Sequence, residues 1–324
     1  MATTNSTIEK IAPMFTDLLI KKIECLKTDW QKPWITSLEQ GLPRNIRGTL
    51  YNGGNVLMLL FYTEFMKFTL PVFLTFNQAK EEDLSVSKGA RSFPVYYWFK
   101  FVVHKETKKT IKYEEYRKLP ATEQENYKVI PQMKYYNVFN IDQTDFAGKY
   151  PERYERMKKG EQPEDCSDGM IYEALDELVY LQNWYCPIKV QYSDSAYYSP
   201  SSDHIVCPQR EQFPQGAEYY GTLLHEMAHS TGSPQRLNRT FGSLFGDALY
   251  AREELVAELT AALCGAFFGY AAVPQENNAA YLKHWLTKLK EEPAFLVEIL
   301  GDVNKAAKMI ADKVTEPINE PAAA

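Results

Sequence analysis

The stretch LLHEMAHSTG, residues 223–232, sets two histidines four positions apart and places a glutamate directly after the first. On an α-helix, positions i and i+4 lie on one face, so His225 and His229 can point toward one ion. Neutral imidazoles suit Zn²⁺, and Glu226 can take a proton from water as the general base of this motif. Gly232 can end the helix as its C′ residue. The stretch therefore predicts a catalytic zinc site, and the alternative is a chance pairing on a buried helix.

A third ligand has to come from elsewhere in the chain. The metzincin pattern would place a histidine at position 235, but this sequence has Gln235 there, which excludes that class. Downstream, YAREELVAELTAALCGAFFGY at residues 250–270 predicts a long apolar helix that carries three glutamates. A buried carboxylate is costly unless it is paired or binds a metal. We predict Glu254 as the third ligand and Glu258, one turn further on, as an acceptor that fixes a histidine ring.

Two alternatives stay open for the glutamates. Glu253 lies about 100° around the helix from Glu254 and is the alternative ligand. The three glutamates could also form a solvated acidic face. Two histidines, one glutamate and an open coordination position are typical of a catalytic rather than a structural zinc site. The predicted chemistry is attack of activated water on a peptide carbonyl, with Glu226 moving the proton to the leaving amine.

Residues before the histidine motif supply two further expectations. HIVCP, residues 204–208, predicts a short strand beside the site that could pair with an extended peptide. An oxyanion donor is also expected, and four tyrosines lie near enough in the sequence to serve: Tyr197, Tyr198, Tyr219 and Tyr220.

Composition and charge bound the class of protein. A length of 324 residues suggests two domains, and a hydrophobic content of 45% is ample for buried cores. No apolar run reaches membrane-spanning length, no secretory signal is visible in MATTNSTIEK, and the five cysteines form no C-x-x-C pair. We therefore expect a cytoplasmic protein with reduced thiols and no membrane partner. Residues 1–150 carry a net charge of +5 and the remainder −11, which suggests separate partners for the two halves.

Hydrophobic periodicity predicts an α+β chain. In the first half we expect helices over residues 7–30 and 56–68, strands over 71–76 and 133–141, and a turn followed by a long strand over 86–105. Pro13 would sit in an early turn of the first helix or kink it. In the second half we expect a helix near 169–183, short strands near 186–208, the two helices of the predicted site, and helices to about 314. The predicted domains are 1–150 and 165–315, joined by a polar linker at 148–168 and followed by a disordered tail at 316–324.

Aromatic and basic residues interleave in the first half, notably in KGARSFPVYYWFKF at residues 88–101. Strand alternation would put Tyr97 and Phe99 on one face and Tyr96, Trp98 and Lys100 on the other, so that one face fills the core and the other offers stacking platforms. Sequence-tolerant binding of single-stranded nucleic acid uses this combination. The alternative is an ordinary aromatic core with a solvated charged rim.

These segments together resemble ArdC-type antirestriction proteins of plasmids and mobile elements. The motifs that carry the resemblance in the first half are WQKPW (30–34), GLPRN, YNGGN, FLTFNQAK, SKGARSFPVYYW and YYNVFNIDQT. Those in the second half are DHIVCP, YYGTLLHEMAHSTG, RLNR and YAREELVAEL. The similarity covers roughly residues 7–270 in the same order. It implies an N-terminal mixed α/β domain that binds single-stranded DNA, followed by a mostly helical zincin-like metallopeptidase domain with a small sheet and bound zinc.

The resemblance also implies protection of incoming DNA from host restriction during transfer. The predicted DNA-binding residues are Lys88, Arg91, Tyr97, Trp98, Lys100, Arg44 and Asn45. Two other functions remain open: a non-catalytic DNA-binding protein with a structural or vestigial zinc site, and a peptidase whose aromatic first half recognises protein. The intact Glu226 favours the catalytic form, because a structural site needs no general base.

Overall fold

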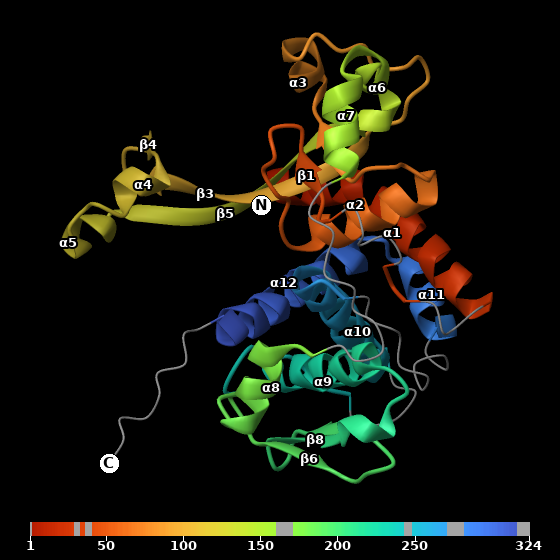
Figure 1. Cartoon of the computed structure of the whole chain (residues 1–324). Helices are drawn as coiled ribbons and strands as arrows, with labels where there is room; N and C mark the ends of the chain where they lie inside the picture. Colours follow the sequence, from red (N-terminus) through yellow and green to blue (C-terminus); the bar gives the residue numbers. More distant parts are fainter. Residues whose placement is uncertain are drawn as a thin grey trace, which may run out of the picture.

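The structure is a computed structural model that describes residues 2–28, 33–35, 41–159, 171–242, 248–270 and 282–315. It has the α+β fold that the periodicity predicts: a five-stranded and a three-stranded sheet lie on opposite sides of a set of packed helices (Figure 1). None of the described helices combines the length and the apolar character that a bilayer-spanning segment requires.

The N-terminal half builds the five-stranded sheet. Its strands are β1 (Arg44–Asn45), β2 (Val72–Leu74), β3 (Phe93–His104), β4 (Thr110–Ile111) and β5 (Tyr127–Asn140), in the spatial order β1-β2-β5-β3-β4. β1 and β2 run parallel, and the other neighbouring strands are antiparallel. β2 and the inner part of β3 are apolar and rich in β-branched and aromatic residues, which favours buried strands.

The long β3–β5 pair leaves the body of the protein as a projecting arm (Figure 1). Its register runs from Phe93 opposite Val138 to His104 opposite Tyr127. We call residues 97–136 the hairpin arm. Besides the outer parts of β3 and β5, it contains β4 and two short helices at its tip, α4 (Tyr113–Tyr116) and α5 (Ala121–Gln124).

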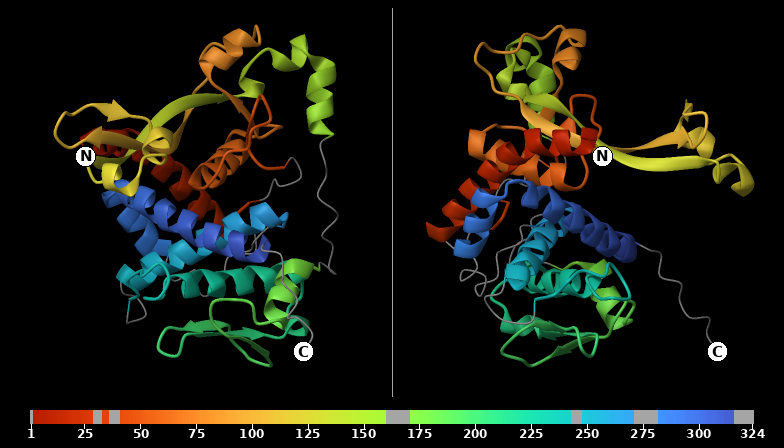
Figure 2. Two further views of the ribbon diagram at one scale, coloured as in Figure 1. Left: turned by 90° about the vertical axis from the view of Figure 1, so that its left-hand side faces the viewer. Right: turned by 180° about the vertical axis from the view of Figure 1, so that it is seen from behind.

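The arm corrects one expectation about β3. Tyr97 and Trp98 are neighbours on opposite faces of the strand, yet 45% of Tyr97 and 53% of Trp98 is exposed. The prediction that one face of this segment fills the core is therefore wrong beyond the buried Tyr96. Strand alternation is present, but the pair projects past the helices that cover its inner part (Figure 2).

Helices cover the body of this sheet on both sides. α1 (Ala2–Thr28) and α2 (Gly54–Met66) pack on the side that faces the rest of the protein, where Phe15 of α1 stacks on Phe93. The first helix begins earlier than predicted, so Pro13 lies inside it rather than in an early turn. A smaller apolar cluster that includes Val72 and Phe146 lies beneath the remaining helices, α3 (Phe76–Glu81), η1 (Ile141–Gln143), α6 (Phe146–Lys149) and α7 (Pro151–Lys158).

The C-terminal half builds the three-stranded sheet, with the order β6-β8-β7. Its strands are β6 (Ile188–Gln191), β7 (Tyr197–Ser199) and β8 (His204–Pro208). β8 is the strand predicted to pair with a peptide, but it is central, with β6 parallel on one side and β7 antiparallel on the other. That expectation is wrong because both edges of β8 are already hydrogen-bonded. The edge strands of this sheet are β6 and β7.

The helices of the C-terminal half form the layer between the two sheets. They are α8 (Glu173–Tyr180), the single 3-10 turn η2 (Arg210–Gln212), α9 (Gly216–Thr231), α10 (Ala248–Phe268), α11 (Leu282–Glu291) and α12 (Ala294–Thr315). α10 is apolar on all sides because it packs against α9, α12 and α2. One continuous hydrophobic core therefore joins α1 and α2 to α9, α10 and α12 (Figure 2).

The predicted domain boundaries fall only partly on described residues. Of the predicted linker, residues 148–159 lie within or next to α6 and α7, and residues 160–168 lie outside the described residues. The predicted tail at 316–324 also lies outside the described residues.

Close packing between the halves predicts opposite effects for two glycine-to-alanine substitutions. A Cβ on Gly54, at the start of α2, would meet the Tyr96 hydroxyl at 2.7 Å and Leu300 of α12 at 3.2 Å. Gly54→Ala is therefore expected to lower the free energy of unfolding by about 1–3 kcal/mol. Gly301→Ala, in α12 with open space around it, should raise it by about 0.5–1 kcal/mol. Denaturant titration measures both, and equal effects would contradict the tight contact at Gly54.

Candidate metal centre

The histidine motif lies on α9, a largely buried helix between the three-stranded sheet and α10 (Figure 1). The helix ends at Gly232, but this glycine is the C-cap residue rather than the predicted C′ residue, and its φ of −78° is not left-handed. The glycine is required for another reason. A Cβ at this position would lie 2.8 Å from the guanidinium of Arg239, so the absence of a side chain allows Arg239 to reach the helix.

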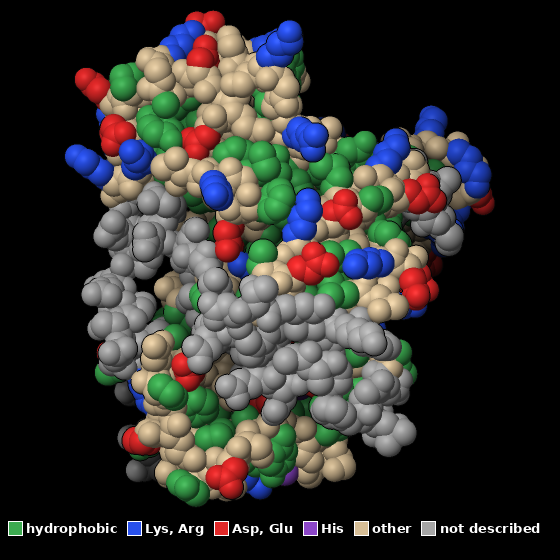
Figure 3. Space-filling model, turned by 90° about the vertical axis from the view of Figure 1, so that its right-hand side faces the viewer, with side chains coloured by type: hydrophobic (Ala, Val, Ile, Leu, Met, Phe, Trp, Pro, Cys, Tyr) green, Lys and Arg blue, Asp and Glu red, His purple; other side chains and the backbone are tan. Residues whose placement is uncertain are grey.

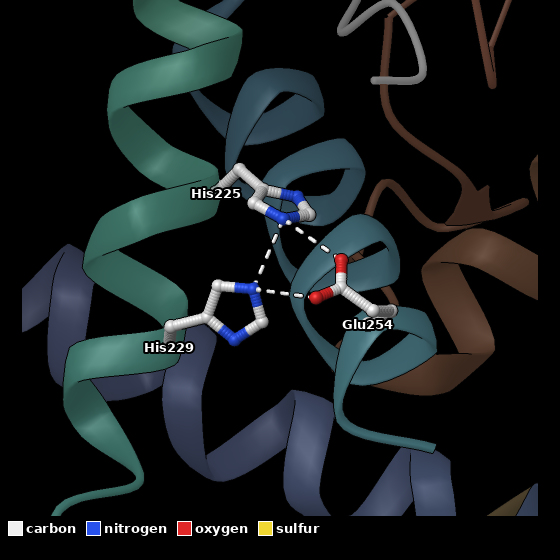
Figure 4. Close-up of side chains that lie close together, drawn as sticks. All are labelled: His225, His229 and Glu254. Atoms are coloured by element: carbon white, nitrogen blue, oxygen red, sulfur yellow. Dashed lines mark hydrogen bonds and ion pairs between the residues drawn. The ribbon is translucent and has the colours of Figure 1, made fainter. Parts of the chain in front are cut away.

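Side chains from α9 and α10 converge at one point. His225 and His229 of α9 and Glu254 of α10 point toward one another (Figure 4). The two Nε2 atoms are 3.1 Å apart, and the Glu254 carboxylate oxygens lie 3.4 Å from Nε2 of His225 and 3.6 Å from Nε2 of His229. Ligand atoms bound at zinc's usual distances around a tetrahedron are about 3.3 Å apart. The three donor atoms are therefore spaced to hold one small cation.

Electrostatics at this point favour positive charge. Burial opposes protonation of His229, yet its pKa is raised well above the ordinary value because Glu254 and Glu253 lie beside it. Burial would raise the pKa of Glu254, but the charge on His229 and the contacts with both imidazoles lower it. In both cases the pocket stabilises a charged pair inside the protein. A divalent cation bound to the three donors would also supply positive charge beside the Glu254 carboxylate.

Glu253, the alternative ligand, is engaged in other hydrogen bonds. Its carboxylate is 97% buried and accepts two hydrogen bonds from the Arg239 guanidinium, at 2.6 and 2.9 Å. It also faces Nδ1 of His229 at 3.2 Å. With Nδ1–H donating to Glu253, the Nε2 lone pair of His229 points at Glu254 and His225. Glu253 therefore orients a histidine ring, the role predicted for Glu258.

Glu258 lies beside the other histidine. Its Oε1 is 3.9 Å from Nδ1 of His225, which is longer than a hydrogen bond, and that Nδ1 is buried without a hydrogen-bond partner among the described residues. Its Oε2 accepts a hydrogen bond of 2.7 Å from Nε1 of Trp34. Trp34 belongs to the N-terminal half, and sequence reasoning missed its part here. The only signal was the WQKPW segment of the family resemblance, which assigns no role to the indole.

Glu226, the predicted general base, is buried next to the two histidines. Burial is the main cause that raises its pKa, and the charges of His225 and His229 oppose this shift. The backbone N–H of Tyr198 in β7 also opposes this shift, which places β7 near the residue that would exchange a proton with water.

The structure separates the four tyrosines proposed as oxyanion donors. The Tyr198 hydroxyl donates to Asp203 at 2.8 Å, and the Tyr220 hydroxyl donates to a carboxylate of α8 at 2.7 Å. Tyr219 is 5% exposed, whereas Tyr197 on the edge strand is 45% exposed. Tyr197 is therefore the member of the four whose hydroxyl is not engaged in a described hydrogen bond and reaches solvent.

The predicted DNA-binding residues fall in three places. Tyr97, Trp98 and Lys100 lie on the hairpin arm, and Lys88 and Arg91 lie in the exposed turn before β3. Arg44 and Asn45 form β1, which is separated from β3 by two strands. Both are half-buried, and Asn45 caps a local turn by accepting hydrogen bonds from the backbone of Arg47 and Thr49.

Sequence reasoning missed part of the aromatic surface of the arm. The side chain of Tyr97 lies 6.1 Å from the rings of both Phe99 and Tyr136, and Nζ of Lys134 lies 4.7 Å from the centre of the Phe99 ring. We call Tyr97, Phe99, Tyr136 and Lys134 the aromatic face of the arm. The strand register brings Tyr136 and Lys134 there, and register could not be read from the alternation of one strand. On the opposite side of the molecule, basic and acidic side chains are intermixed rather than gathered into a basic patch (Figure 3).

Comparison with known proteins identifies both halves. Residues 9–139 match the family described as the N-terminal domain of anti-restriction factor ArdC, and residues 174–299 match the family described as zincin-like metallopeptidase. The chain therefore belongs to these two families, one in each half, in the arrangement of an ArdC-type protein. The zincin-like domain implies a metal ion, and the group formed by His225, His229 and Glu254 lies within it.

Solved structures and curated proteins extend this match. The chain is 28% identical to the antirestriction ArdC protein from the R388 plasmid. The match to the metal-free structure covers 95% of this chain and 99% of that chain, with a TM-score of 0.67. The match to the Mn(II)-bound structure covers 94% of this chain and 98% of that chain, with a TM-score of 0.66. Two proteins of Escherichia coli named DNA primase TraC are 28% and 29% identical over 94% and 89% of this chain. The chain spans only 28% and 19% of their lengths. Uncharacterized protein y4eC of Sinorhizobium fredii is 27% identical, with 89% of this chain and 87% of that protein covered.

Proposed function

We propose that this is an antirestriction-type protein of a mobile element that binds single-stranded DNA through its N-terminal half and carries a zinc-dependent peptidase site in its C-terminal half. The observation that carries the proposal is the convergence of His225, His229 and Glu254 in a zincin-like domain. We assign residues 1–150 to DNA binding and 165–315 to the peptidase, with 148–168 as the connection between them. The cytoplasm is the proposed location, since the buried cysteines Cys186, Cys207 and Cys264 form no disulfide among the described residues.

Zinc is the proposed metal. Two imidazoles and one carboxylate that leave a coordination position open form the donor set of catalytic zinc sites. The Mn(II)-bound structure of the R388 protein concerns a relative, and it supports a divalent metal without selecting one for this chain. When bound, the metal would acidify a water molecule and polarise a carbonyl oxygen.

The residues of this chain would provide the remaining chemistry. Glu226 is buried beside the donor atoms, and its raised pKa suits a carboxylate that takes a proton and then gives it up. The site lies in a dry environment, because both histidines and all the nearby glutamates are largely buried. Water exclusion strengthens each electrostatic interaction in such a site.

We propose an extended peptide as the substrate. In the described part of the chain, β7 pairs with β8 along one edge only, so its other edge has backbone groups available for a further strand. β7 is also the strand whose backbone N–H at Tyr198 lowers the pKa of Glu226. A peptide paired with β7 would thus run past the proposed general base.

We propose the hairpin arm as the binding surface for single-stranded DNA. Trp98 is exposed on one face of the arm and the aromatic face lies on the other, so both sides offer rings for base stacking. Lys100 and Lys134 lie over the rings of Tyr113 and Phe99 respectively, where each cation can also meet a phosphate. Lys88 and Arg91, in the turn before β3, would extend this surface toward the body.

Substitution of the metal-site glutamates separates binding from catalysis. Glu254→Gln is expected to lower the affinity for Zn²⁺ by more than ~100-fold, the upper end of the effect of an outer-shell residue. Glu226→Gln should keep the zinc content of the wild-type protein and lose peptide hydrolysis, because only the general base is removed. Competition with a chromophoric chelator measures affinity, and a peptide library measures hydrolysis. Wild-type zinc affinity in Glu254→Gln would remove that residue from the ligand set.

Substitutions on the arm test DNA binding. Trp98→Ala and Tyr97→Ala should each weaken binding of a labelled oligothymidylate about 5- to 150-fold, the equivalent of ~1–3 kcal/mol per stacked base. Tyr180→Ala is the matched control, since this tyrosine of α8 is 85% exposed but far from the arm in sequence and fold. Fluorescence anisotropy at two salt concentrations should also show weaker binding at the higher one. Equal losses in all three variants, or none, would contradict this surface.

A further inference from the structure

A tryptophan from the N-terminal half reaches the metal site of the C-terminal half. Trp34 is fully buried, and its indole Nε1–H donates to Oε2 of Glu258 at 2.7 Å although the two residues are 224 positions apart. Its ring lies 6.3 Å from that of Phe61 in α2. The position of the indole is therefore fixed by the packing of the N-terminal half.

The two histidines have parallel surroundings. Nδ1 of His229 faces Glu253, and Glu253 is held by Arg239. Nδ1 of His225 faces Glu258 at 3.9 Å, and Glu258 is held by Trp34. Each imidazole thus has a glutamate of α10 behind it, and each glutamate is held by a donor: Arg239 bonds to both oxygens of Glu253, and Trp34 bonds to Oε2 of Glu258.

The two donors differ in origin. Arg239 comes from the segment directly after α9, within the zincin-like domain, whereas Trp34 comes from the segment between α1 and β1. A histidine that binds a metal through Nε2 carries its proton on Nδ1, and a carboxylate facing that proton fixes the ring and raises the basicity of the ligand nitrogen. For His225 the only such carboxylate among the described residues is Glu258, so its orientation decides whether the ring is supported.

We propose that Trp34 is a positioning residue of the metal centre: by fixing Oε2 of Glu258 it turns Oε1 toward His225, so that the N-terminal half completes the site. This inference rests on the metal site of the proposed function. It makes metal affinity a property of the whole chain rather than of the zincin-like domain alone. Neither the ligands nor the general base would change in a protein that lacked this contact.

A double-mutant cycle tests the proposal in the full-length protein. Trp34→Phe removes the donor and keeps an aromatic ring, and it should lower Zn²⁺ affinity roughly 10-fold, the lower end of the effect of outer-shell partners. In a Glu258→Ala background the same substitution should change the affinity by less than about twofold, because the residue through which Trp34 acts is gone. A loss of similar size in both backgrounds would overturn the proposal and assign Trp34 a packing role.

Trp184→Phe is the matched control. Nε1 of Trp184 donates to the Ser230 hydroxyl on α9 at 2.9 Å, so this variant also loses a buried indole hydrogen bond, next to His229 in sequence but away from the glutamates of α10. Its zinc affinity should stay within about twofold of the wild type. Equal losses in Trp34→Phe and Trp184→Phe would overturn the specific role of Trp34.

A measurement on the wild-type protein covers the case in which Trp34→Phe does not fold. With ¹⁵N-labelled indoles, the Nε1–H resonance of Trp34 should shift on addition of Zn²⁺, whereas that of Trp184 should not. Phe variants of the other tryptophans assign the peaks. A Trp34 resonance unaffected by bound zinc would overturn the role of Trp34 alone. A wild-type protein that takes up no divalent metal would overturn the metal site itself and this inference with it.

Discussion

Four carboxylates are buried within the space of two helices, and the rest of the site depends on how their charge is balanced. Glu226 lies on α9, and Glu253, Glu254 and Glu258 lie on α10, each less than one-tenth exposed. Buried carboxylates are tolerated only when they are paired, hydrogen-bonded or bound to a cation. The buried guanidinium of Arg239 offsets the charge of one of these carboxylates, because it donates two hydrogen bonds to Glu253. Glu254 lies between the two imidazoles, where a bound divalent cation would balance the remaining negative charge.

The surrounding fold keeps this arrangement dry and fixed. α10 carries the glutamates on a helix that is otherwise apolar on every side, because α9, α12 and α2 surround it. The hydrophobic core that contains α10 also contains α1 and α2, so the two halves stabilise one another around the site. The arm, by contrast, has its outer rings in solvent. One part of the molecule thus supplies a rigid interior for chemistry, and another supplies an accessible surface for a long, flexible ligand.

Local patterns in the sequence predict the parts of this structure that local geometry determines. The α+β class is confirmed, and the spacing of His225 and His229 suffices to place their rings on one face of a helix. The separate roles of Glu253 and Glu258 could not be predicted, because both lie on one apolar helix and differ only in their distant partners. Arg239 and Trp34 select those roles, and neither contact leaves a periodic signal. The course of the arm could not be predicted for a similar reason. Alternation in β3 predicts that the strand has two faces, but it does not predict that both faces project beyond the body of the protein.

The most direct test of the account is X-ray absorption at the zinc edge on the full-length protein loaded with one equivalent of Zn²⁺. We expect a first shell of nitrogen and oxygen alone at about 2.0–2.2 Å, with the multiple-scattering signature of two imidazoles. A sulfur ligand at about 2.3 Å, or a shell with fewer than two imidazoles, would contradict a centre formed by His225, His229 and Glu254.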